Sequence, residues 1–287
     1  MALVVNTNMA STNALNNLNR VNRRLSGTFE RISSGLRIAR AGDDAAGLAV
    51  AENLDAATRG LNVARRNVND GLGLLQIAEG ATNEVANNLK RMRELAVQSA
   101  SETLDNTERQ YIQTEYTQLE SEIHRIANIT EFNGVGISRG ASTNASGALG
   151  LTSLDVQVGI HDTTDDRITI QLGNLTTGAS GLALTNNTVS LASAASAQAA
   201  LSRIDTALDS VNTYRATFGA LQNRLDSTLR NLETYSENMR AAESQIRDAD
   251  FAHEAAEMSK LQIMQQAGTA VLGQANQINQ GAVRLLG

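Results

Sequence analysis

The sequence contains neither proline nor cysteine, and these two absences exclude several kinds of protein. Without cysteine there is no disulfide framework, no thiolate catalysis and no cysteine-rich zinc site. Without proline, which breaks helix interiors and stiffens loops, long uninterrupted helices are favoured. Tryptophan is also absent and aromatic residues make up only 3% of the chain, so most of the hydrophobic 41% is Ala, Leu, Val and Ile. This composition favours thin seams between helices over a thick globular core.

The net charge of −6 is spread unevenly over the 287 residues. Residues 1–42 hold six arginines and a single acid, Glu30, whereas residues 258–287 hold two basic residues and no acid. The two ends therefore carry +5 and +2, which leaves −13 for residues 43–257. This contrast indicates that the ends and the middle have different surroundings. The first six residues lack the basic leader and apolar run of a signal peptide, and no stretch approaches the ~20 apolar residues of a membrane span.

Both ends carry a narrow apolar stripe at steps of mainly three and four residues, which predicts amphipathic helices. The stripe of residues 9–38 consists of Leu15, Leu18, Leu25, Phe29, Ile32 and Leu36. The stripe of residues 254–285 contains Leu261, Met264, Val271, Ala275, Ile278, Ala282 and Leu285. No charge occurs between Lys260 and Arg284, although a solvated helix normally carries charge on its free face. We therefore expect both ends to pair with each other and with other copies, and these stripes to be assembly seams.

The middle of the chain is predicted to contain three longer helices. The first covers about residues 45–100, after a break at residues 40–45. The second starts near a capping-box pattern at Thr107 and Gln110. The third runs from about residue 193 to beyond 240. The stripe predicted for the first consists of Val68, Leu75, Ala78, Val85, Leu89, Met92 and Ala96.

Alternating apolar residues between the second and third of these helices predict one β-hairpin. One strand carries Leu154, Val156, Val158 and Ile160, and its mate carries Ile168, Ile170 and Leu172. The expected fold class is mainly α: long antiparallel helices forming a coiled-coil rod with paired termini and a small β-hairpin insertion. The expected domains are 1–44 plus 251–287, the inner terminal coiled coil; 45–135 plus 193–250, the helical rod; and 136–192, the hairpin insertion. We expect the insertion at the rod tip, facing solvent, and the terminal helices to order only on assembly.

Patterns for catalysis or metal binding are weak. His253-Glu254 begins like a zinc-protease motif, but Glu257 stands where a second histidine is required. Asp162, Asp165 and Asp166 lack EF-hand spacing and suit a turn. The arginines near the N-terminus have a single aromatic residue among them, Phe29, which is too little for a series of stacked bases. We expect no enzyme activity, no catalytic residue, no metal, no cofactor, and no nucleic-acid or membrane partner.

Several long stretches, in the right order, resemble the conserved ends of bacterial flagellins. The N-terminal stretches are Ile32-Ser-Ser-Gly-Leu-Arg-Ile38, Asp43-Asp-Ala-Ala-Gly47 and Leu89-Lys-Arg-Met-Arg-Glu-Leu-Ala-Val-Gln-Ser99. The C-terminal ones include Gln222-Asn-Arg224 and Gln262-Ile-Met-Gln-Gln-Ala-Gly-Thr-Ala-Val-Leu272. The resemblance covers about residues 1–135 and 195–287, so the chain looks like a short flagellin without separate outer domains.

This resemblance implies a secreted, extracellular structural subunit that polymerises into the bacterial flagellar filament for motility after unfolded export by the flagellar type III system. It implies as partners further copies of the chain, an export chaperone at the C-terminal segment, and filament cap and junction proteins. It also implies contact with a vertebrate innate receptor and between rods at positions matching Arg91, Leu95 and Glu115. A hook–filament junction protein, or a secreted coiled-coil adaptor, would use similar helices, and both remain alternatives.

Overall fold

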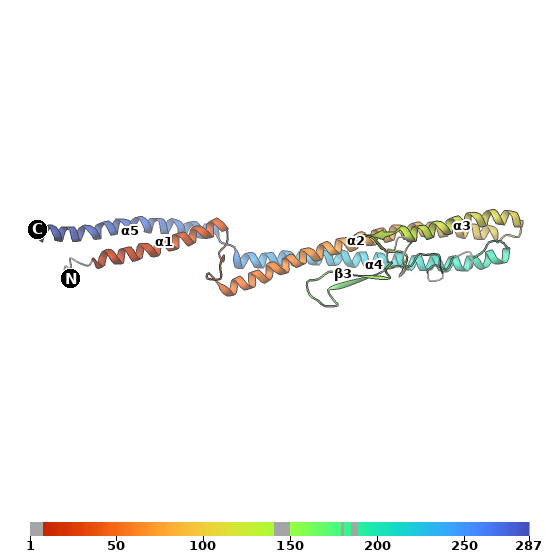
Figure 1. Cartoon of the computed structure of the whole chain (residues 1–287), viewed down its shortest axis with the longest axis horizontal. Coiled ribbons are helices and arrows are strands. Elements are labelled where there is room, and N and C mark those ends of the chain that lie inside the picture. The colour runs from red at the N-terminus through yellow and green to blue at the C-terminus, as the bar shows by residue number, and fades with distance from the viewer. Residues whose placement is uncertain (1–7, 141–149, 179–180, 185–188, 287) are drawn as a thin grey trace. The chain divides into compact units, whose positions relative to one another are not determined.

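The computed structural model describes residues 8–140, 150–178, 181–184 and 189–286, with side chains described as far as residue 277. These residues form five helices and two short β-hairpins (Figure 1). The helices are α1 (Met9–Ser34), α2 (Ala45–Ser99), α3 (Asn106–Ile129), α4 (Ala194–Arg247) and α5 (Phe251–Leu286). The strands are β1 (Glu131–Phe132), β2 (Val135–Gly136), β3 (Ser153–Gln157) and β4 (Arg167–Gln171). The mainly α fold class with a small hairpin is confirmed.

The chain forms two compact units, which divide within helices and not at helix ends. Unit 1 contains residues 1–58 and 237–287, and unit 2 contains residues 59–236. The predicted domain boundaries at 44/45 and 250/251 coincide instead with the breaks before α2 and α5.

In unit 1, α1 and α5 form an antiparallel pair (Figure 1). The Asn8 side chain accepts a hydrogen bond from the Ser11 backbone N–H and so caps α1. The helix ends at Gly35, earlier than the predicted residue 38, because Gly35 adopts φ 71° and donates its N–H to the Arg31 carbonyl. Asp250 accepts hydrogen bonds from the first turn of α5 in the same way.

The two breaks in unit 1 are joined to each other by backbone hydrogen bonds. The N–H of Arg37 donates to the Arg247 carbonyl at 2.7 Å, and the N–H of Ala249 donates to the Gly35 carbonyl at 2.9 Å. The Arg37 guanidinium also donates to the Ile246 carbonyl at 2.7 Å, near the end of α4. The chain leaving α1 is therefore tied to the chain entering α5.

Unit 2 has the thicker interior, and the seam of α2 follows the predicted pattern. All seven predicted seam residues of α2 are buried. On α4 the large buried side chains recur every seven residues and are Ile204, Val211, Phe218, Leu225 and Leu232. Helix α3 contributes Ile112, Tyr116 and Ile123 to the same side. The heptad spacing keeps one narrow face of each helix turned inward along its length.

The cap predicted for α3 is wrong by two residues. Asp105, not Thr107, is the N-cap: its carboxylate accepts from the Glu108 N–H at 2.8 Å, and the Glu108 side chain accepts from the Asp105 N–H at 3.0 Å. Both pairs fit the sequence pattern of a capping box. Aspartate outranks threonine at this position, and its charge also favours the helix N-terminus.

The predicted hairpin is confirmed as β3 and β4, with Val156 opposite Ile168 and Leu154 opposite Ile170. A second hairpin, β1–β2, was not predicted. It turns at Asn133 and Gly134, both with positive φ, which is the Asn-Gly signal of a tight hairpin turn.

The insertion does not face solvent as a whole, which corrects one expectation, and it reaches the end of the rod only in part, where the Leu191 carbonyl accepts from Ser99 at the end of α2. After the hairpin, residues 172–191 bury Leu172, Leu175, Leu182, Leu184, Val189 and Leu191. Several of these leucines join the cluster formed by α2, α3 and α4. The hairpin lies beside Gly60 and Gly71 of α2, where an added Cβ would meet Ile160 and Val156. The α2–α3 connection lies at the end of unit 2 that is farther from this hairpin (Figure 1).

Candidate functional site

The α1–α5 pair is held together by polar contacts as well as apolar ones. The Arg31 guanidinium donates two hydrogen bonds to the Glu254 carboxylate, at 2.8 and 3.0 Å. This contact raises the pKa of Arg31 above its ordinary value, mainly through the hydrogen bond to Glu254. Asn22 accepts from the Gln265 amide at 3.0 Å, and the Asn8 amide donates to the Ala275 carbonyl at 3.0 Å. These contacts fix one antiparallel register, because directional partners must meet at defined positions.

The predicted seam residues divide into those that face the partner helix and those that face outward. Leu261 is buried, and Leu18, Leu25, Ile32, Leu36 and Met264 are half-buried. Leu15, Phe29 and Val271 are 47%, 64% and 58% exposed. The side chains of Ile278 and Leu285 lie outside the described residues. A single pairing of α1 with α5 therefore covers only part of the apolar stripe on each helix.

Sequence reasoning missed the polar members of this interface. Glu254 is buried although it is charged, and Thr28 is buried on α1. Leu272 is half-buried whereas Val271 is exposed, and Gly268 allows a close approach to Leu18. One signal was present: Asn22 occupies the one vacant position of the α1 seam, where a polar residue can fix register.

The three receptor and inter-rod contact candidates do not share one surface. Arg91 and Glu115 are half-exposed and form an ion pair at 2.8 Å, and Glu94 also pairs with Arg91. The hydrogen bonds that Arg91 donates, first to Glu94 and then to Glu115, raise the pKa of Arg91. Leu95 is only 1% exposed and belongs to the core cluster. The expectation that Leu95 is a surface contact therefore needs correction for the folded unit, since its side chain has no face left for a partner.

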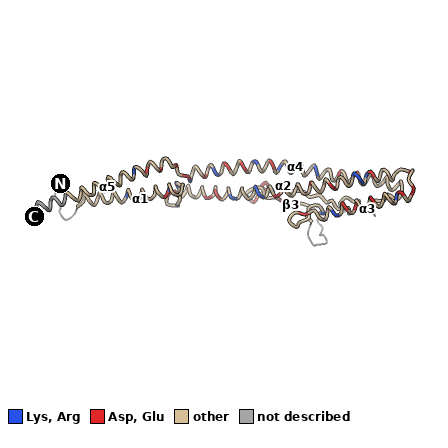
Figure 2. Tube along the Cα trace, turned by 90° about the horizontal axis from the view of Figure 1, so that it is seen from above, with Lys and Arg blue, Asp and Glu red and all other residues tan. Residues whose placement is uncertain are grey.

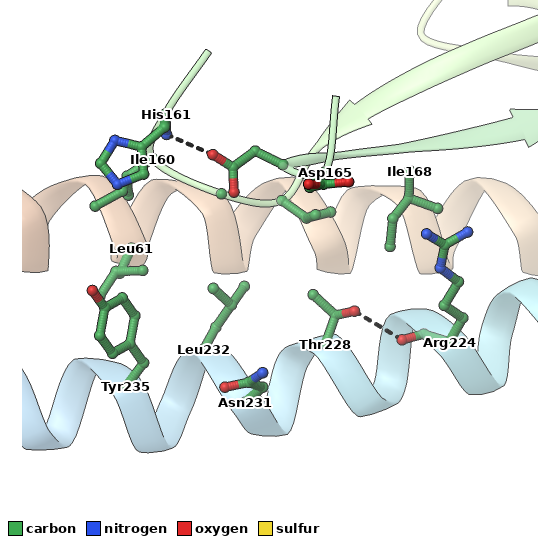
Figure 3. A pocket seen from close by; sticks show the side chains of 13 residues that line it. Leu61, Ile160, His161, Asp165, Ile168, Arg224, Thr228, Asn231, Leu232 and Tyr235 are labelled. Atoms are coloured by element: carbon green, nitrogen blue, oxygen red, sulfur yellow. Dashed lines mark hydrogen bonds between the residues drawn. The ribbon is translucent and has the colours of Figure 1, made fainter. Parts of the chain in front are cut away.

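A groove of about 350 Å³ lies between the hairpin turn and helices α2 and α4 of unit 2 (Figure 3). Leu61 on α2 and Leu232 and Tyr235 on α4 supply apolar walls. The turn above is held by Asp166, which accepts a hydrogen bond from the His161 backbone N–H at 2.9 Å. The described residues contain no group of three or more His, Asp or Glu side chains able to hold a metal ion. Nor do they include a helix long and apolar enough to cross a membrane.

Family models match nearly the whole of both helical parts of the chain. The bacterial flagellin N-terminal helical region matches residues 5–143, and the bacterial flagellin C-terminal helical region matches residues 201–286. The chain belongs to the bacterial flagellin family. Both matches cover the terminal pair, the breaks at its base and the rod helices of unit 2.

Curated flagellins align with this chain from end to end. Flagellin FlaB2 of Treponema pallidum is 38% identical over 287 residues, covering 99% of this chain and 100% of the relative. A flagellin of Halalkalibacterium halodurans is 40% identical over 294 residues, with the same coverage. A flagellar hook-associated protein of Vibrio parahaemolyticus shares the fold, with a TM-score of 0.58 over 72% of this chain at 18% identity. The full-length flagellin matches favour a filament subunit over the junction and adaptor alternatives.

Proposed function

We propose that this chain is a structural subunit of the bacterial flagellar filament, and that it polymerises through the outward faces of its paired terminal helices. Membership of the flagellin family supports the filament role, and that family is structural and not enzymatic. Such a subunit belongs outside the cell, in the filament used for motility. One observation carries the assembly mechanism: large apolar side chains face outward all along the α1–α5 pair. They are Met9, Leu15 and Phe29 on α1 and Phe251, Ile263 and Val271 on α5.

The distribution of charge on α5 supports burial in an assembly. Helix α5 continues to Leu286, yet Lys260 and Arg284 enclose a segment without any charged residue. Figure 2 shows this long uncharged stretch toward the C-terminus. An isolated pair of helices would expose these side chains to water on every side but one. Neighbouring copies would cover them and supply the apolar burial that the pair lacks.

The contacts between copies are heterologous. A surface on one copy meets a different surface on the next, and repetition of such a contact generates an open helical filament. The terminal seams supply the inner contacts, and the exposed faces of unit 2 supply the outer ones. Arg91 and Glu115, which lie on such a face, remain candidates for contact with a neighbouring rod or with an innate receptor.

The thin interior of unit 1 supports export in an unfolded state and capture by a chaperone. Of the large apolar side chains described in unit 1, only Ile38 and Leu261 are buried. A C-terminal segment with so little intramolecular burial is available to an export chaperone before assembly. The chain also contains no disulfide to break and no proline to isomerise when it refolds after passage. Cap and junction proteins would meet the same end surfaces in the finished filament.

Seeded growth followed by electron microscopy tests the assembly function. Short filament seeds are mixed with the intact chain, with a chain lacking residues 1–40 and 255–287, and with a Phe29→Ser/Val271→Ser variant. We expect long filaments from the intact chain alone, while the thermal transition of unit 2 is retained in all three. An intact chain that stays monomeric, or only caps the seeds, would overturn the proposal in favour of a junction protein or adaptor.

A further inference from the structure

Unit 1 is electrically polar along its own length. Asn8 contacts Ala275 and Arg31 contacts Glu254, so the two antiparallel helices have a free half and a half next to the helix breaks. The free half, residues 9–34 and 251–286, carries a net charge of +3. The break half, residues 35–58 and 237–250, holds eight acids and four arginines and so carries −4.

A basic groove lies in the free half, between α1 and α5. It has a volume of about 420 Å³; Arg23 and Arg24 form its rim, and Thr28 and Leu261 form its buried floor. Gly27 leaves room above that floor because it has no side chain. The guanidinium groups of Arg23 and Arg24 are exposed and have no hydrogen-bond or ion-pair partner among the described residues. Two unpaired guanidinium groups at the rim of this groove fit a carboxylate.

The groove already contains two other charged side chains, and both are satisfied within the subunit. Arg31 is held by Glu254 from within the pair. Glu257 lies on the opposite wall and pairs with Lys260 at 3.0 Å. Neither wall residue neutralises Arg23 or Arg24, so the positive rim stays available to a carboxylate from outside.

The break half holds two exposed carboxylates, one without a partner in the described part of the chain and one in a long ion pair. Several of its aspartates are committed to backbone groups: Asp43 accepts from Arg40, Asp44 from Gly47, and Asp250 from the start of α5. Glu237 is exposed and has no partner among the described residues. The Glu52 side chain is 59% exposed and is held only by a 3.5 Å ion pair with Arg247.

We propose that the Arg23–Arg24 groove of one copy receives the acidic break half of a second copy, with Glu52 and Glu237 as the contacting carboxylates. The inference rests on the proposed self-assembly and adds to it what sets the stagger between neighbouring copies. If two neighbouring copies lie parallel and in register, the basic half of one lies beside the basic half of the other. A basic half and an acidic half meet when copies are displaced along the α1–α5 axis by on the order of 30 Å, roughly 20 residues of helix. Repetition of that step is non-closing, as a filament requires.

Charge reversal with restoration tests this contact. The variants are Arg23→Glu/Arg24→Glu, Glu52→Lys/Glu237→Lys, and the chain that combines all four changes. An Arg66→Glu/Arg230→Glu variant is the matched control for Arg23→Glu/Arg24→Glu, because it makes the same change in net charge at two exposed residues of unit 2 whose guanidinium groups are unpaired in the described part of the chain, away from the Arg91–Glu115 pair in the sequence. The readout is the critical concentration for growth on purified filament seeds, measured by sedimentation. Far-ultraviolet circular dichroism checks that each monomer keeps the helix content of the intact chain.

We expect each double reversal to raise the critical concentration about tenfold, because like charges would then face each other across the contact. The critical concentration of the variant with all four changes should return to within about threefold of that of the intact chain. The critical concentration of the matched control should equal that of the intact chain. Growth of the Arg23→Glu/Arg24→Glu variant at the intact level, or failure of the combined variant to recover, would overturn the contact. If the intact chain itself does not grow on seeds, the proposed function fails first, so the two failures are distinguishable.

Discussion

Arg31 of α1 and Glu254 of α5 form a two-point ion pair between segments that are 223 residues apart in the sequence. Glu254 is buried and Arg31 also donates to Thr28, so the pair is part of the helix interface and not an exposed surface ion pair. Burying a charge costs free energy unless a partner compensates it. The value of this pair therefore lies in specifying which residues of the terminal helices meet.

Removing one partner of this pair should cost more than removing both. We expect Arg31→Ala to destabilise the terminal pair by about 2–3 kcal/mol, because Glu254 is left buried without a partner. The Arg31→Ala/Glu254→Ala variant should recover part of that loss. The measurement is a double-mutant cycle on the thermal stability of assembled filaments. Strictly additive losses would show that the two side chains are not coupled.

Amide hydrogen exchange of the monomer should separate the two units. Unit 2 buries a continuous seam on α2, α3 and α4, whereas α1 and α5 bury few large side chains. A helix without tertiary burial is marginal in water. We expect fast exchange in α1 and α5 and slow exchange along α4 near Phe218, with α1 and α5 becoming protected in filaments. Equal protection of both units in the monomer would contradict coupled folding and assembly.

Arg109 is a buried arginine whose partners are all backbone carbonyls. Its guanidinium donates to Ser99 at 3.0 Å, Leu104 at 2.8 Å and Ser101 at 2.6 Å, and so holds the α2–α3 connection closed. Arg109→Met should lower the free energy of unfolding by about 2–4 kcal/mol, because these carbonyls lose their donors. Urea unfolding measures this, and Arg203→Met is the control at an exposed site. Matching midpoints for the two variants would argue against the role.

Leu191 tests whether the insertion is part of the rod. Its side chain is buried in the core cluster, its N–H donates to the Gln113 side chain at 2.6 Å, and its carbonyl accepts from Ser99 at 2.7 Å. Leu191→Ala should cost about 2–5 kcal/mol through the cavity that it creates. Ile129→Ala, at a site that is more than half exposed, should change stability by less than about 0.5 kcal/mol. A small effect at both sites in urea unfolding would restore the picture of a loosely attached loop.

Tyr116 predicts how stability responds to alkaline pH. Burial raises the pKa of this phenol above its ordinary value, and its hydroxyl has no described hydrogen-bond partner. Above pH of about 10 the unfolded chain loses this proton while the folded chain keeps it, so the free energy of unfolding falls as pH rises. Tyr116→Phe should be at least as stable at pH 8 and should lose less stability between pH 10 and 11. An identical alkaline decline in both proteins, measured by urea unfolding, would rule this out.

The main elements followed from local patterns in the sequence. The spacing of three and four residues between Val85, Leu89 and Met92 predicted the buried face of α2. The alternation of apolar and polar residues predicted the hairpin in which Val156 pairs with Ile168. Helix periodicity and strand alternation are local properties, because they depend only on residues a few positions apart. The Asn-Gly turn of β1–β2 was equally local, and its signal at Asn133 and Gly134 could have been used.

Tertiary structure decided what local pattern could not. On α1, Leu15 and Phe29 fit the same stripe as Leu18, yet only Leu18 turns toward α5. That choice depends on where the second helix lies, because one partner covers only part of a helix surface. The same holds for Leu95, which lies outside the stripe predicted for α2, and for Leu191, whose irregular segment has no periodic pattern. The sequence by itself determined the helices, their apolar seams and the family. The packing of segments that are distant in sequence determined which seam residues are buried within the subunit and which stay exposed for contact with neighbouring copies.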